Sequence, residues 1–195
     1  MKKRKIPLML AIGIGLILVS LCVTLVFQLR MHIGTQKSHQ VVSKMDKILP
    51  ERTPGVSGVY MDAHMPVLEI DGVDYVAMIE VPAFGTRLPV ADQWISQKLF
   101  NSPARFSGSA YDQTLVIGGA DYGQQFAFCD RIQHEAIVVV TDMTGAEFTY
   151  AVLDIDRSKH AESQWLLDGD CDLTLFCRDM YSMEYIAVRC VRVYN

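Results

Sequence analysis

The chain has 195 residues, of which 18 are Lys or Arg and 22 are Asp or Glu, and half of them are hydrophobic. This length suits one domain with an appendage, and the hydrophobic content is sufficient to bury a core. The net charge of −4 argues against a nucleic-acid partner, because surfaces that bind nucleic acid are strongly basic.

The chain begins with a basic segment and a long apolar run. Four of the first five residues are Lys or Arg, and residues 6–27 are predominantly apolar. A helix of that length spans roughly 33 Å, enough to cross the hydrocarbon core of a bilayer. A cleaved signal peptide is the alternative, but its apolar region is about 7–15 residues and ends at a small-residue site, which residues 27–30 lack. We therefore expect an uncleaved anchor at 6–29.

The distribution of charge predicts the orientation of that anchor. Basic residues concentrate in the tail at 1–5, so we expect a single-pass protein of the cell membrane with a cytoplasmic N-terminus and an extracellular C-terminal part. Beyond the tail the chain holds 14 basic and 22 acidic residues, a net charge of −8. The five cysteines show neither a C-x-x-C pair nor a zinc-like His spacing, so we expect no metal and no cofactor. Asp154 and Asp156 are interpreted as solvated carboxylates.

The part beyond the anchor changes from helical to strand patterning. Residues 30–66 predict a helical stalk and a linker, with the Pro- and Gly-containing stretch "TPGVSG" at 53–58. From 67 onward, short β-branched and apolar runs dominate, and 136–155 reads as a hairpin with its turn at "DMTG". Helical signals are short, at 91–100 and 126–132. Closely spaced strands of this kind favour a mainly β fold, a barrel or a sandwich.

Three stretches carry a family resemblance. Residues 65–90 ("MPVLEIDGVDYVAMIEVPAFGTRLPV"), 102–122 ("SPARFSGSAYDQTLVIGGADY") and "CDLTLFCRD" followed by "YIAVRC" resemble the sortases, which are membrane-anchored cysteine transpeptidases of Gram-positive bacteria. The resemblance implies a sortase-like eight-stranded β-barrel with short helices over residues 67–195, preceded by one transmembrane helix. It also implies a mechanism that uses a cysteine, a histidine and an arginine.

The histidine position is substituted. The family strand ends in a pattern like V-I-A-G-H-N-Y, whereas this chain has "VIGGADY" at 116–122, with Ala120 where the histidine stands. Alanine has no proton to transfer to a leaving group. The next histidine downstream, His134, is interpreted as a solvated surface residue.

The cysteine position depends on the alignment. The family pattern T-L-x-T-C, read without a gap, places Cys177 on the second threonine and Arg178 on the nucleophile. A deletion of one residue restores Cys177 as the nucleophile. Strand side chains alternate between faces, so a shift of one residue moves each side chain to the opposite face. We favour the reading without a gap and keep Cys177 as a catalytic candidate only if the gap is allowed.

The arginine position is also substituted. In the family this arginine opens the last strand, and here Glu184 or Tyr185 takes its place, depending on the register. Arg189, further along, is interpreted as a structural strand residue. A carboxylate is unsuited to steady a developing oxyanion, which requires hydrogen-bond donors and positive charge.

These observations leave three functional hypotheses. The first is a pseudoenzyme: a sortase homologue, degenerate at Ala120, Arg178 and Glu184, that binds a sorting-signal-like peptide or a surface protein without cutting it. The second is an active sortase, a cysteine transpeptidase or hydrolase that uses Cys177 with rearranged partners to attach proteins to the cell wall or assemble pili. The third is a structural envelope domain without a binding site. Whether the chain is an enzyme is therefore left open at this point.

Overall fold

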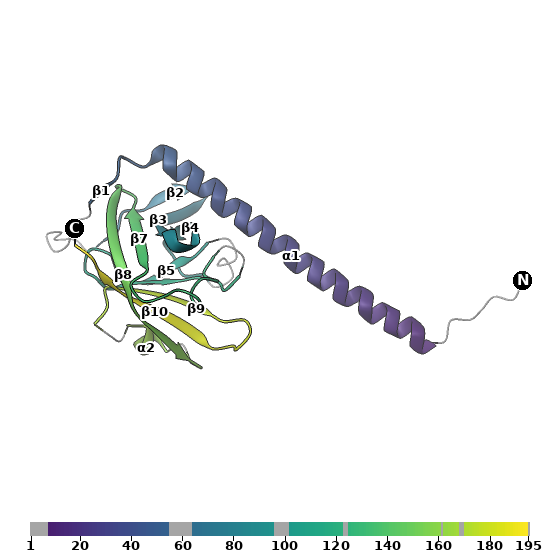
Figure 1. Ribbon diagram of the computed structural model, residues 1–195. Coiled ribbons are helices and arrows are strands. Elements are labelled where there is room, and N and C mark those ends of the chain that lie inside the picture. The colour runs from purple at the N-terminus through teal and green to yellow at the C-terminus, as the bar shows by residue number, and fades with distance from the viewer. Residues whose placement is uncertain are drawn as a thin grey trace, which may run out of the picture.

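The computed structural model describes residues 8–54, 64–95, 102–122, 125–160, 162–167 and 170–194, arranged as a long helix that leads into a barrel (Figure 1). The basic tail, most of the predicted linker at 53–58 and the second half of the predicted helix at 91–100 lie outside the described residues.

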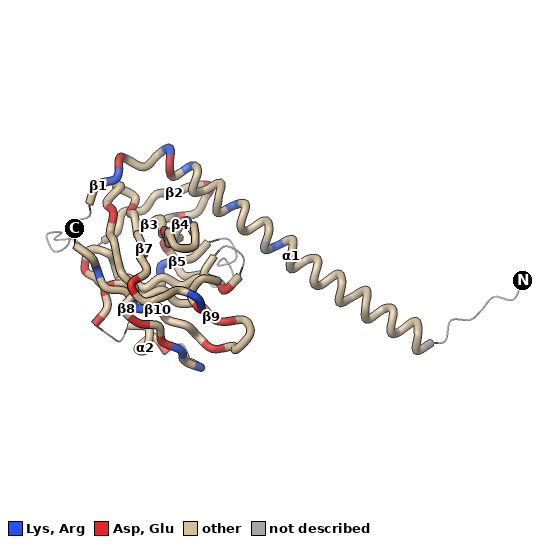
Figure 2. The backbone as a smooth tube through the Cα atoms, in the orientation of Figure 1, with Lys and Arg blue, Asp and Glu red and all other residues tan. Residues whose placement is uncertain are grey.

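The long helix is α1 (Leu8–Ile48). Its first half is apolar and exposed, with 87% of Met9 and 37% of Phe27 accessible to solvent. This half projects away from the barrel and carries no charged residue among those described (Figures 1 and 2). Among the described helices, α1 is long and apolar enough to cross a membrane. It continues without a break through residue 30, so its 41 residues form a rod of about 61 Å.

The second half of α1 packs on the barrel. Gly34, Ser38, Val41, Val42 and Met45 are all buried. This spacing of three, four and seven residues places all five on one face of the helix. Val41, Val42 and Met45 form a cluster with three buried side chains of the barrel, Ile70, Tyr75 and Met78.

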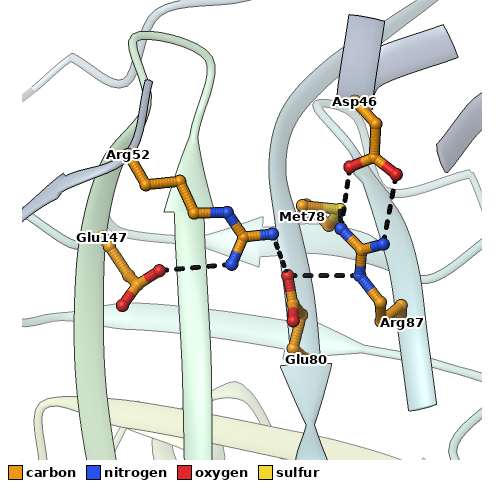
Figure 3. A network of polar contacts seen from close by, with 6 residues as sticks. All are labelled: Asp46, Arg52, Met78, Glu80, Arg87 and Glu147. Carbon is orange, nitrogen blue, oxygen red and sulfur yellow. Dashed lines mark hydrogen bonds and ion pairs between the residues drawn. The ribbon is translucent and has the colours of Figure 1, made fainter. Parts of the chain in front are cut away.

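An ion-pair network fixes the end of α1 to the sheet (Figure 3). The Arg87 guanidinium donates to both oxygens of Asp46 on α1, at 2.8 and 3.1 Å, and Arg87 Nε lies 3.3 Å from Glu80. Arg52 bridges Glu80 at 2.5 Å and Glu147 at 3.2 Å. These five side chains come from α1, the segment after it and three different strands, so the network fixes the direction in which α1 leaves the barrel.

In the described part of the chain, ten strands follow α1. They are β1 (Thr53–Pro54), β2 (Leu68–Ile70), β3 (Val73–Val81), β4 (Thr86–Ala91), β5 (Ala104–Ser107), β6 (Leu115–Gly118), β7 (Ile137–Asp142), β8 (Ala146–Ser158), β9 (Leu173–Arg178) and β10 (Tyr185–Arg192). The short helices are η1 (Pro82–Phe84), a 3₁₀ turn, and α2 (Ser163–Leu167).

Eight of the strands close a barrel. The pairing runs β3–β4–β5–β6–β9–β10–β8–β7 and returns to β3, because β7 pairs with both β8 and β3. The pairs β4–β5 and β6–β9 are parallel, and the other pairs of the ring are antiparallel. Strands β1 and β2 pair outside this ring. The prediction of a mainly β, eight-stranded barrel with short helices after a long apolar N-terminal helix is confirmed.

The hairpin predicted at 136–155 is formed by β7 and β8. Asp142 holds its turn, since its Oδ1 atom accepts hydrogen bonds from the amides of Thr144 at 2.8 Å and Ala146 at 2.9 Å. Gly145 has φ +84, a conformation that costs glycine little. The two short helices predicted at 91–100 and 126–132 are not found in the described residues. Residues 92–95 are not helical, and residues 127–131 form turns with hydrogen bonds such as Cys129 N to Phe126 O.

Candidate functional site

The alternation of side chains on β9 decides which of its residues face the barrel interior. Leu173, Leu175 and Cys177 belong to the main core cluster inside the barrel. Phe176, between them, packs on the outside in a second cluster with Val116, Ala187 and Leu166. Arg178, two residues after Phe176, lies on the same outer side as Phe176 and is exposed. We call the outer surface of β6, β9 and β10, with the side chains that pack on it, the outer face.

Cys177 lies inside the barrel. Its side chain is 1% exposed, and its sulfur donates to the Phe126 carbonyl at 3.8 Å. It adjoins Cys129, whose thiol pKa is raised by burial and also by the contact with Cys177. In the described part of the chain, the hydrogen-bond acceptor of the Cys177 sulfur is the Phe126 carbonyl and not a histidine. The catalytic role of Cys177, which requires the one-residue gap, stays a hypothesis.

Ala120 lies two residues beyond the end of β6. The backbone around it is held tightly, because Gly119 N donates to Phe176 O at 2.9 Å and Phe126 N donates to Ala120 O at 3.0 Å. A Cβ on Gly119 would lie 2.5 Å from the Phe126 ring, so glycine permits this close approach. The backbone at Ala120 is therefore firmly held, and the Ala120 side chain is a methyl group with no proton to donate.

Arg178 and Tyr185 face each other across β9 and β10. The two residues are paired in the antiparallel register, and the Arg178 guanidinium lies 5.5 Å from the centroid of the Tyr185 ring. Arg178 Nε also donates to the Met183 carbonyl at 3.3 Å. Glu184 is the last residue of the turn, and its carbonyl accepts from Asp179 N at 2.8 Å. Tyr185, rather than Glu184, is thus the residue opposite Arg178 on the outer face.

Two carboxylates shape the turn between β9 and β10. Asp179 accepts from the Ser182 hydroxyl at 2.7 Å and from Tyr181 N at 2.8 Å, and these hydrogen bonds lower the pKa of Asp179. Asp121, next to Ala120, accepts from Met180 N at 3.0 Å. Burial raises the pKa of Asp121, and the nearby Asp179 charge adds to that effect. Asp121 therefore ties the loop after β6 to this turn at some electrostatic cost.

Replacing Asp121 with asparagine is expected to stabilise the fold at neutral pH. Asparagine keeps an oxygen acceptor for Met180 N and removes the partly desolvated charge. A raised pKa means that the folded state holds the Asp121 proton more tightly than the unfolded state, so wild-type stability falls as pH rises from below about 3.8 through the folded pKa. Thermal melting of Asp121→Asn and wild type should coincide at pH 3 and separate in favour of the variant at pH 7.

The matched control for that comparison is Asp154→Asn on the exposed part of β8. It should leave the difference in melting temperature near zero at both pH values. A loss of stability in Asp121→Asn at pH 7 would contradict the assignment, because it would mean that the charge itself strengthens the link to Met180.

An aromatic cluster lies on the outer face, around Phe176 of β9. Trp94 packs on Phe176 with ring centroids 5.2 Å apart and on Phe106 at 5.6 Å. A Cβ on Gly118 would lie 2.1 Å from the Trp94 ring, so glycine is required for this packing. A cavity of about 540 Å³ adjoins Trp94 and Phe106. In the sequence, the signal for the close approach of Trp94 is the glycine pair at 118–119.

Other predicted residues lie elsewhere. His134 is exposed, and its Nδ1 atom lies 2.8 Å from the Leu153 carbonyl. Asp156 accepts from Arg189 at 3.1 Å, and Asp154 accepts from Ile155 N at 2.8 Å, so both carboxylates have protein partners. Within the described ranges, no group of three His, Cys, Asp or Glu side chains could hold a metal ion.

The fold can now be compared with those of known proteins. No family model matches the chain, and no curated protein matches it. Among solved structures, the chain is similar to sortase A from Corynebacterium diphtheriae, with 18% identity, a TM-score of 0.55 and coverage of 86% of this chain and 84% of the other. Sortase C-1 from Actinomyces oris has 18% identity, a TM-score of 0.54 and coverage of 83% and 99%.

A third similar structure is sortase C1 from Streptococcus agalactiae, with 20% identity, a TM-score of 0.56 and coverage of 65% of this chain and 72% of the other. Together with the closed eight-stranded ring, these likenesses establish that the chain has the sortase fold. At this level of identity they establish the fold alone.

Proposed function

We propose that this chain, which has the fold of the sortases, is a membrane-anchored extracellular protein that binds a sorting-signal-like peptide or a surface protein without cleaving it. The observation that carries the proposal is the placement of two neighbouring side chains. The Cys177 sulfur is inside the barrel, whereas Arg178 is exposed on the outer face beside Tyr185.

The chemistry of peptide cleavage by a cysteine supports this choice over an active transpeptidase. A thiol that attacks a peptide must reach it, and collapse of the intermediate requires a general acid, commonly worth about 10²–10⁴-fold in rate. Cys177 is 1% exposed, and Ala120 cannot donate a proton. The alternative, an active sortase that uses Cys177, requires β9 to shift by one residue and thereby to turn Phe176 into the core.

The outer face has features suited to an extended peptide. Arg178 offers an exposed guanidinium, which pairs with a carboxylate through two parallel hydrogen bonds. Trp94 and Phe106, together with polar side chains such as Asp92 and Arg105, line a cavity of about 540 Å³ that can receive a side chain of the peptide. The occupant we infer is therefore a peptide with an acidic group or a free carboxylate and a side chain that enters this cavity.

The anchor supports the proposed location. The exposed apolar half of α1 requires an apolar environment, and the predicted basic tail favours a cytoplasmic N-terminus. In that orientation the barrel lies outside the cell, where an acidic surface suits a soluble domain.

Extraction of membranes with alkaline carbonate tests the anchoring by α1. Because the apolar half of α1 spans the bilayer in this proposal, the full-length chain should stay in the membrane pellet.

Peptide titration tests the binding function. The full-length chain in a non-ionic detergent is titrated with a panel of fluorescent sorting-signal peptides, and anisotropy is measured. We expect saturable binding that weakens about tenfold in Arg178→Glu, the cost of replacing a charge-assisted hydrogen bond with a repulsion. The control is Lys44→Glu, an exposed substitution on α1, which should leave binding unchanged. Binding that is insensitive to Arg178→Glu, or no binding to any peptide, would reject the proposed site.

A further inference from the structure

Two cysteines meet inside the barrel, where the turns at 127–131 pack against β9. Cys177 is the last interior residue of β9, and Cys129 lies within those turns. The two side chains are 1% and 0% exposed, and both belong to the main core cluster. Both cysteines are free thiols in this structure. They come from segments that are 48 positions apart in the chain, so their meeting is a product of the fold.

The two thiols are direct neighbours. The Phe126 carbonyl accepts a hydrogen bond from the Cys177 sulfur at 3.8 Å and another from Cys129 N at 3.0 Å. One oxygen atom therefore joins the sulfur of one cysteine to the backbone of the other. The Cys129 thiol also makes a hydrogen-bond contact with Cys177. Two sulfur atoms held in contact from fixed backbone positions are the arrangement that a disulfide requires.

Two of the other cysteines lie too far along the strands to replace Cys129 as the partner of Cys177. Cys190 pairs with Leu173 on β9, four residues or about 13 Å before Cys177. Cys171 precedes Cys177 by six residues, or about 20 Å of extended chain. A disulfide requires Cα atoms within about 7 Å of each other, so both distances exclude a bridge. Cys22 belongs to the first half of α1, which projects away from the barrel (Figure 1).

We propose that Cys129 and Cys177 form a disulfide bond in the exported protein. The step joins the two sulfur atoms and releases two protons and two electrons, which reduce the disulfide of an exported thiol oxidoreductase to two thiols. Disulfides form and persist in the oxidising space outside the cell. The inference therefore rests on the extracellular location in the proposed function, but not on peptide binding at the outer face.

The bond forms before the barrel closes. In the folded chain both sulfur atoms are buried, so an external disulfide cannot reach them. Burial, together with the neighbouring Cys177, also raises the pKa of the Cys129 thiol, which disfavours the thiolate that attacks a disulfide. During folding both thiols are accessible, and the packing of the turns on β9 then brings them together. Once folded, the reduced and oxidised proteins should interconvert slowly.

The bond closes a loop that contains β7, β8 and α2, and it ties the turns at 127–131 to β9. Such a constraint on the unfolded chain stabilises the folded state, and we expect the oxidised protein to melt roughly 5–10 °C above the reduced protein. The bond also consumes the Cys177 thiol, so the oxidised protein has no free sulfur at that position of β9.

Refolding under defined redox conditions tests the pair. The full-length chain is unfolded and reduced in urea, refolded in a non-ionic detergent with reduced and oxidised glutathione, unfolded again and alkylated. Of its five cysteines, two should be joined and three alkylated, and proteolysis should release a peptide that links Cys129 to Cys177. Cys129→Ala and Cys177→Ala should each lose the linked peptide. The matched control Cys190→Ala, also buried in the core, should keep it.

A second arm examines the chain isolated from its own membrane, with free thiols alkylated before lysis, and should find the same linked peptide. Five alkylated cysteines after refolding, or a bridge through any other cysteine, would overturn the pair. A bridge that forms on refolding but is missing from the isolated chain would overturn the bond in the exported protein and would count against the extracellular location. The carbonate extraction and the peptide titration report on α1 and on the outer face, so their failure is distinguishable from a failure here.

Discussion

Replacing Arg178 with cysteine is expected to create a thiol that reacts at least about 100-fold faster than the thiol of Cys177. A buried thiol reacts only after local opening of the structure, and each 1.4 kcal/mol of opening free energy slows its reaction about tenfold. Arg178 is exposed on the outer face, whereas Cys177 is 1% exposed inside the barrel. The measurement is the rate of labelling of the full-length variant with a charged methanethiosulfonate, followed by peptide mapping.

Cys171 provides an internal reference in the same protein. It is partly exposed, and its sulfur lies 3.4 Å from the Thr174 hydroxyl, so it should react at an intermediate rate. Cys22 in the first half of α1 should be shielded from the charged reagent by the detergent micelle. If Cys177 and the new cysteine were labelled at equal rates, β9 would expose both of its faces, and the assignment of Cys177 to the interior would fail.

Replacing Arg189 with methionine is expected to lower the free energy of unfolding by about 3 kcal/mol, as is typical when one partner of a buried polar network is removed. Arg189 is 5% exposed. It donates to the Leu166 carbonyl at 2.9 Å, to the Trp165 carbonyl and to Asp156 at 3.1 Å. Methionine fills much of the space but leaves the two carbonyls of α2 without their donor.

Urea denaturation of the full-length variants measures this effect. Arg178→Met serves as the control, because it removes an exposed guanidinium from the neighbouring strand and should change stability by less than about 0.5 kcal/mol. A similar midpoint for Arg189→Met and wild type would mean that α2 is held to the sheet by its apolar contacts, such as Leu166 in the outer cluster, rather than by this arginine.

The barrel could be predicted because its strands carry strong local signals. The β7–β8 hairpin is an example, since Asp142 and Gly145 fix its turn through local hydrogen bonds and backbone conformation. The length of α1 was harder to predict. The sequence changes from apolar to polar at residue 30, which suggested a separate stalk, but helix geometry and the packing of Val41 and Met45 on the barrel carry α1 through Ile48.

The site was less predictable than the fold, because its geometry depends on register and on distant contacts. The sequence allowed Cys177 to be shifted by one residue, whereas in the structure Phe176 packs against Trp94 on the outside and so holds Cys177 inside. The choice between Glu184 and Tyr185 depended on where the turn ends, and the pairing of Tyr185 with Arg178 sets that point. The link from Asp121 to Met180 joins residues 59 positions apart.

The central claim is that Cys177, inside the barrel, is not a working nucleophile, and peptide cleavage tests this claim most directly. The full-length chain and its Cys177→Ala variant are incubated with the panel of sorting-signal peptides, and products and protein masses are followed by mass spectrometry. We predict no cleavage and no acyl adduct on either protein. Cleavage by the wild-type chain that disappears in Cys177→Ala, accompanied by a thioester adduct at Cys177, would contradict the account.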